Sequence, residues 1–149
     1  MDFKRCSEDL QHSLTVVEEN GRKFTIHNQK KKRIKKVQVD GCLVNDKRQR
    51  CDYLFEIEQV CHCVIYLELK GSDIEHAFNQ LAATMKYLER RHQTLTKVCH
   101  IVASRVPRAG PKVQNLKLQM ARKHKALLFV DTQEANVNIE REPYQDTSA

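Results

Sequence analysis

The chain has 149 residues, of which 40% are apolar and 30% charged, enough for one modest hydrophobic core. No apolar run approaches the length of a membrane span, and the first residues lack the apolar segment of a secretory signal. These features exclude a membrane-spanning protein and predict a soluble, cytoplasmic protein with no membrane partner.

The net charge is +7, from 26 Lys and Arg against 19 Asp and Glu. The bases are clustered in residues 30–36, 47–50 and 105–125, whereas residues 131–146 are acidic. Clustered positive charge suits a polyphosphate partner, because contact releases condensed counterions. The alternative interpretation is a solvated surface that only aids solubility.

The first predicted element is a β-hairpin over residues 14–28, in which two β-rich runs are joined by Asn20-Gly21. This dipeptide accepts the positive φ angles of a tight turn. A third strand is expected over residues 34–44. Residues 50–58 and 62–70 are rich in β-branched and aromatic side chains, and their short linker predicts an antiparallel hairpin.

Ser72, with Glu75 three residues later, predicts a capping box that opens a helix over residues 73–90. Apolar side chains then recur at helical spacing, at positions 74, 77, 78, 81, 82, 85 and 88. A buried strand is predicted over 97–104. Pro111 can start a second helix, and a short apolar strand covers 126–130.

This order of elements predicts the α/β (α+β) class, with a mixed central sheet flanked by helices. We expect a single domain over residues 1–149, with a core at about 34–130 and an acidic, partly disordered tail over 131–149.

Six cysteines are present, and without an export signal we expect all of them to remain thiols. A zinc site is the alternative. The only closely spaced group is Cys61-His62-Cys63, which does not have the spacing of paired zinc knuckles.

Charged residues on the predicted 50–58 and 62–70 hairpin suggest chemistry. Facing residues of an antiparallel pair have position numbers with a constant sum, and a turn near Val60 sets Asp52 opposite Glu68. Lys70 leaves the same strand face as Glu68. Two facing carboxylates repel, and Mg²⁺ or Mn²⁺ would remove the repulsion. Such an ion can activate water against a phosphate, and the lysine can neutralise developing charge.

The pattern Asp52…Glu68-Leu69-Lys70, on a strand hairpin followed by a helix, resembles the PD-(D/E)xK nuclease superfamily over roughly residues 34–105. The resemblance implies a restriction-endonuclease-like core, to which the 14–28 hairpin is added. It also implies metal ligation by Asp52, Glu68 and the Leu69 main-chain carbonyl, with Lys70 as the catalytic lysine. Gln80 on the following helix is the candidate for a contributing glutamine.

The sequence departs from the family pattern in three places. Cys51 precedes Asp52 where proline is usual, and Thr84 stands where one branch of the family has a tyrosine. Many members also carry a glutamate on an N-terminal helix, for which Glu8 and Glu18 are the candidates here.

The expected function is therefore that of a Mg²⁺- or Mn²⁺-dependent deoxyribonuclease acting on duplex or branched DNA, in repair, recombination or defence against foreign DNA. A homodimer is expected, because a duplex offers two strands to cut. The residues expected to contact nucleic acid are Lys31, Lys32, Arg33, Lys35, Arg48 and Arg50.

Two other readings stay open. One is a catalytically inactive nuclease-like domain that binds nucleic acid or a protein partner. The other is an unrelated small α/β interaction domain in which the acidic pair is accidental. For Glu68 and Lys70 themselves, the alternative to an active site is an exposed strand face on which they form surface pairs that contribute little energy.

Overall fold

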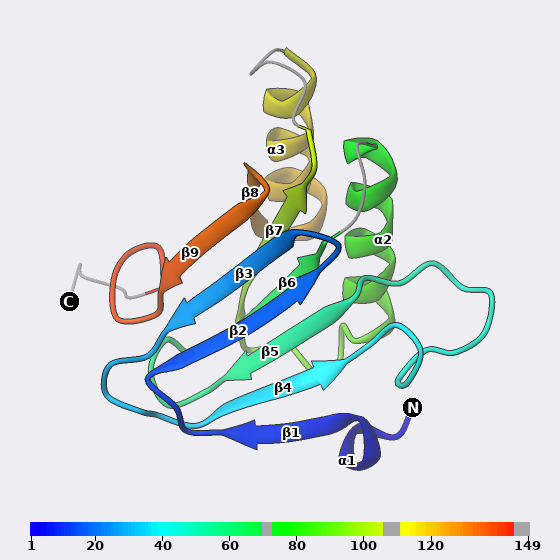
Figure 1. The fold of residues 1–149 in the computed structure, drawn as a ribbon. Helices are drawn as coiled ribbons and strands as arrows, with labels where there is room; N and C mark the ends of the chain where they lie inside the picture. Colours follow the sequence, from blue (N-terminus) through cyan, green and yellow to red (C-terminus); the bar gives the residue numbers. More distant parts are fainter. Residues whose placement is uncertain (70–72, 106–110, 145–149) are drawn as a thin grey trace.

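The computed structural model describes residues 1–69, 73–105 and 111–144 of the chain. Figure 1 shows three layers: two long helices on one side of a central sheet and a smaller sheet on the other. The fold class predicted from the sequence, a mixed sheet with helices, is confirmed. The smaller sheet as a separate covering layer was not predicted.

The central sheet contains six strands. Across the sheet they are β1 (Ser7–Leu10), β4 (Ile34–Gln38), β5 (Tyr53–Ile57), β6 (Cys63–Glu68), β7 (Thr96–Ala103) and β8 (Ala126–Thr132). Neighbours from β1 to β6 run antiparallel, whereas β6, β7 and β8 run parallel. Parallel neighbours need a crossover connection, and the two long helices lie in these crossovers.

The first crossover helix, α2 (Ile74–Tyr87), begins after Asp73, whose side chain accepts a hydrogen bond from the His76 N–H at 3.0 Å. Asp73 therefore has the N-cap role that the sequence assigned to Ser72, which lies outside the described residues. The helix buries its predicted apolar face, including Phe78 and Leu81.

The second crossover helix, α3 (Pro111–His124), buries Val113, Leu116 and Met120. A short helix, α1 (Phe3–Cys6), precedes β1. Among the described residues, no helix has both the length and the apolar character needed to cross a membrane.

The smaller sheet contains the predicted N-terminal hairpin, β2 (Leu14–Glu19) and β3 (Arg22–His27), together with β9 (Glu134–Asn138). Asn20 and Gly21 have φ angles of 50° and 78°, as a tight hairpin turn requires. β9 pairs in parallel with β3.

The expectation of a peripheral tail after residue 131 is wrong for its first part. Residues 134–138 form the ordered strand β9, and Tyr144 is buried. Residues 145–149, also assigned to that tail, lie outside the described residues.

Each face of the central sheet has its own core. Leu54 and Tyr66 pack with α2 and α3 on one face. Phe55 and Leu67 pack with the smaller sheet, including Phe24, on the other. Side chains alternate between faces along a strand, so Asp52 shares the helix-covered face with Leu54, and Glu68 shares it with Tyr66.

A buried polar network anchors the turn that follows α2. His92 Nε2 lies 2.5 Å from Glu56 Oε2, and His92 Nδ1 lies 2.5 Å from the Tyr66 hydroxyl. Arg91 donates two further hydrogen bonds to the Glu56 carboxylate. A carboxylate only accepts, so the His92 Nε2–H donates to Glu56, while Nδ1 pairs with the Tyr66 hydroxyl.

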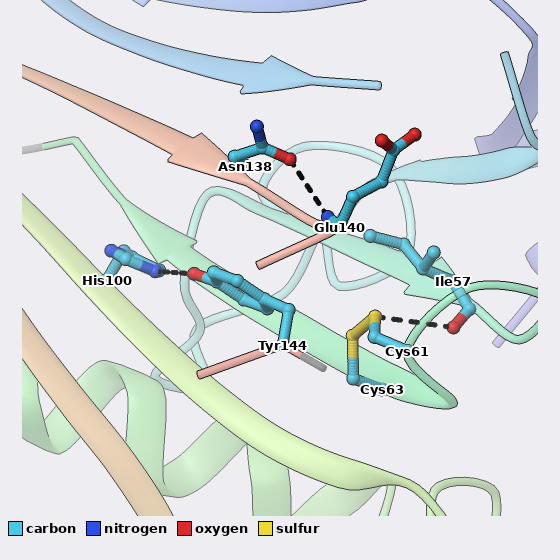
Figure 2. The surroundings of a disulfide bond; sticks show 7 residues. All are labelled: Ile57, Cys61, Cys63, His100, Asn138, Glu140 and Tyr144. Atoms are coloured by element: carbon cyan, nitrogen blue, oxygen red, sulfur yellow. Dashed lines mark hydrogen bonds between the residues drawn. A yellow bond between two sulfur atoms is a disulfide. The ribbon is translucent and has the colours of Figure 1, made fainter. Parts of the chain in front are cut away.

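The expectation that all six cysteines are thiols is wrong for four of them. Cys6–Cys42 and Cys61–Cys63 are disulfides, with Cα atoms 5.7 Å and 5.2 Å apart, whereas Cys51 and Cys99 are free and buried. The first bond joins α1 to the loop after β4, a proximity set by the pairing of β1 with β4. Figure 2 shows the second bond, and Cys63 shares a buried cluster with Tyr144.

Candidate functional site

Asp52 and Glu68 lie at the edge of the central sheet where β5 begins and β6 ends. The ladder pairs Tyr53 with Leu67 and continues to Ile57 with Cys63, the register expected from the sequence. One further step sets Asp52 opposite Glu68 on the helix-covered face. The Asp52 N–H donates to the Leu67 carbonyl at 3.1 Å, which keeps the two chains together at this point.

The Asp52 side chain is fixed by the end of β6. Its Oδ2 accepts a hydrogen bond from the Leu69 N–H at 2.8 Å, and this contact is buried. The carboxylate is therefore held against the backbone of the Glu68-Leu69 dipeptide.

Both carboxylates are covered. Asp52 exposes 2% of its surface and Glu68 exposes 0%. The alternative in which Glu68 forms surface pairs on an exposed strand face is therefore wrong. Burial raises the pKa of the neighbouring Cys51 thiol well above its ordinary value, and the charges of Glu68 and Asp52 act in the same direction. The two acids are thus within electrostatic reach of the same thiol.

The oxygen ligands available here suit a hard divalent cation. Two carboxylates and a main-chain carbonyl resemble the ligands of Mg²⁺, which retains water and phosphate in its other positions. Within residues 1–69, 73–105 and 111–144, no three His, Cys, Asp or Glu side chains gather as a metal-binding group. These residues therefore offer no structural zinc site, which needs four protein ligands. Lys70 lies outside the described residues.

The Leu69 carbonyl, the third predicted ligand, already has a partner. Arg22 Nε at the start of β3 donates a hydrogen bond to this oxygen. Glu19, directly across the hairpin from Arg22, accepts from the Tyr53 hydroxyl at 3.3 Å. The tip of the β2–β3 hairpin thus reaches the edge of the central sheet beside the two acids.

The sequence did not indicate these hairpin residues. The acids considered near the N-terminus, Glu8 and Glu18, are both exposed, and half-buried Glu19 lies nearer the site. No local pattern distinguishes Arg22 or Glu19, because their position depends on how the two sheets pack.

Gln80 lies on α2, one turn before Thr84 on the same helix face. Thr84 Oγ1 accepts a hydrogen bond from the Cys51 N–H at 2.8 Å, which ties this face to the segment entering Asp52. The side-chain oxygen of Gln80 is buried and accepts no hydrogen bond in the described part of the chain. Gln80 therefore has an acceptor available near the site, whereas His76 on the same helix is exposed.

The predicted nucleic-acid contacts fall into two groups. Arg48 and Arg50 precede Asp52 in the chain, but their side chains form ion pairs with Asp46 and Asp40 at 2.9 Å. The other four, Lys31, Lys32, Arg33 and Lys35, lie near the far end of β5.

In the β4–β5 ladder, Lys35 lies opposite Glu56. Glu56 is four residues from Asp52 along the chain, a separation of roughly 13 Å at the rise per residue of a strand. The structure therefore does not gather this group around the acids, although a duplex backbone can span such a distance.

Comparison of the chain with protein-family models, curated proteins and solved structures finds no match.

Proposed function

We propose that the chain is a metal-dependent nuclease of the PD-(D/E)xK type that hydrolyses phosphodiester bonds in DNA. The observation that carries the proposal is the register of β5 and β6, which continued by one step sets Asp52 opposite Glu68, with the Asp52 carboxylate accepting from the Leu69 N–H. The order of strand hairpin, α2 and parallel strand β7 around this pair supports it.

Each residue has a proposed task in the reaction. A bound divalent ion would polarise the phosphoryl oxygen and lower the pKa of a water nucleophile. Asp52 and Glu68 would hold that ion, and the hydrogen bond from the Leu69 N–H fixes the direction of the Asp52 carboxylate. Lys70 neutralises charge that develops on the phosphate, and the Gln80 side-chain oxygen orients the attacking water by accepting a hydrogen bond from it.

The proposed partner is duplex or branched DNA, held through its phosphates by the basic residues near the far end of β5. We also propose a homodimer, which light scattering of the purified protein tests, and a cytoplasmic location. Disulfides are rare in the cytoplasm. Alkylation of the protein inside its own cells tests the location, because Cys6–Cys42 and Cys61–Cys63 disulfides that persist there would argue against the cytoplasm.

Burial favours a second candidate, a nuclease-like domain without activity that binds nucleic acid or a protein partner. A phosphate can reach Asp52 and Glu68 only if the chain that covers them moves, because together they expose almost no surface. If it does not move, the fold retains its basic surface without catalysis.

The test is cleavage of plasmid, linear and branched DNA with Mg²⁺, with Mn²⁺ or with EDTA. We expect cleavage that needs the ion and is lost in Asp52→Asn, Glu68→Gln and Lys70→Ala, by at least about 100-fold in rate. Glu58→Gln, an exposed acid at the other end of β5, is the matched control and should cleave like the wild type.

Cleavage that survives EDTA or the Asp52→Asn substitution would reject the proposed mechanism. DNA binding without cleavage by the wild-type protein would instead support the inactive domain.

A further inference from the structure

Arg22 is a fixed positive charge at the proposed metal site, and no pattern in the sequence pointed to it. Its side chain is half-buried, and its Nε donates to the Leu69 carbonyl. A guanidinium is charged at every pH at which a protein is folded. The same oxygen would be a ligand of the divalent ion proposed above.

The two cations compete for this position. A magnesium ion lies about 2.1 Å from a ligand oxygen, and a hydrogen-bonded guanidinium nitrogen lies roughly 3 Å from the same oxygen. Both charges would therefore lie within about 5 Å of each other beside two almost fully buried carboxylates, where water screens the repulsion of like charges poorly. Binding of the ion must move Arg22 away or weaken its contact.

The hairpin offers Arg22 a second position. Glu19 is its direct cross-strand partner, so their side chains leave the same face of the hairpin. Glu19 is half-buried and its carboxylate accepts from the Tyr53 hydroxyl beside the site. A guanidinium released from Leu69 can pair with this carboxylate, because the two side chains leave the same face of the hairpin.

We propose that Arg22 is a built-in cation that holds the Leu69 carbonyl in the metal-free protein and is displaced when a divalent ion binds. Arg22 thereby lowers the affinity of the site for the ion and stabilises the chain in its absence. This inference rests on the proposed metal site at Asp52 and Glu68, and it makes Arg22 a positioning residue.

The test measures Mn²⁺ affinity by calorimetry and thermal unfolding in EDTA. Arg22→Gln keeps an N–H donor for the Leu69 carbonyl but removes the charge, so it should bind Mn²⁺ more tightly, on the order of tenfold. Arg22→Ala should also bind more tightly and should unfold at a lower temperature in EDTA. Lys23→Ala removes the same charge from the next, exposed position and should leave affinity unchanged.

Unchanged or weaker Mn²⁺ binding by Arg22→Gln overturns the inference, as does an equal loss of melting temperature in Arg22→Ala with and without Mn²⁺. The Asp52→Asn variant distinguishes a failure of the role given to Arg22 from a failure of the proposed metal site. If it abolishes Mn²⁺ binding while Arg22→Gln binds like the wild type, only the role of Arg22 fails. If no variant binds Mn²⁺, or Asp52→Asn binds normally, the metal site itself fails.

Discussion

Glu56 is a buried acid whose carboxylate stays ionised because other side chains donate hydrogen bonds to it. Burial alone would raise its pKa, but hydrogen bonds from His92 and Arg91 outweigh that effect and lower the pKa from 4.5 to about 2. Glu56 shares the helix-covered face with Asp52, yet it lies four residues away and is already paired. We therefore assign it to stability and not to the proposed chemistry.

Acid unfolding tests this assignment. The folded-state pKa of Glu56 lies below its ordinary value, so unfolding takes up a proton and stability falls as pH drops from about 4.5 toward 2. At pH 7, Glu56→Gln should lower the free energy of unfolding by about 1–3 kcal/mol. The difference from wild type should shrink toward pH 3, where the wild-type carboxylate loses its advantage.

Urea unfolding at pH 7, 5 and 3 measures this difference. Glu58→Gln is the control, because Glu58 is exposed two residues further along the chain. A difference between Glu56→Gln and wild type that stays constant with pH would show that the charge of Glu56 does not matter.

At the scale of the elements, α2 is fixed to the segment that enters β5. The Thr84 hydroxyl accepts from the Cys51 N–H and donates to the Gln80 carbonyl at 2.9 Å. Thr84 is 1% exposed, so water cannot replace it as an acceptor. This single side chain joins the helix that carries Gln80 to the residue that precedes Asp52.

Removal of that hydroxyl should loosen the candidate site. Thr84→Val keeps the shape but leaves the Cys51 N–H buried without an acceptor, which should cost about 1–3 kcal/mol of unfolding free energy. Thr84→Ser keeps the hydroxyl and should retain most of the stability. Hydrogen exchange at the Cys51 amide should accelerate in the valine variant only, and equal exchange in both variants would contradict the role given to Thr84.

Elements that depend on local signals were predictable from the sequence. The Asn20-Gly21 turn and the helix α2 were predictable because their signals lie in residues that are close together in the sequence. The register of β5 and β6 followed from the constant sum of facing position numbers around a short turn. β1 and β9 were missed because both are short and are stabilised by pairing with distant strands. For the same reason the sequence could not show that Arg22 reaches Leu69.

At the scale of the whole molecule, the second sheet decides what surrounds the two acids. Figure 1 shows the β2–β3 hairpin lying across the central sheet, with its turn near the edge where β6 ends. This packing brings a cation and a carboxylate, Arg22 and Glu19, to a place where the sequence suggested only Asp52, Glu68 and Lys70. The near-complete burial of Asp52 and Glu68 makes access, rather than ligand identity, the condition that the proposed activity must meet.

Anomalous diffraction from crystals grown with Mn²⁺ tests the central claim most directly, because it locates the ion without relying on activity. We expect one peak for each chain, about 2.0–2.3 Å from carboxylate oxygens of both Asp52 and Glu68, with Arg22 moved off the Leu69 carbonyl. A peak bound elsewhere, or fully formed crystals in which Asp52 and Glu68 show no bound ion at millimolar Mn²⁺, would contradict a metal site at this pair.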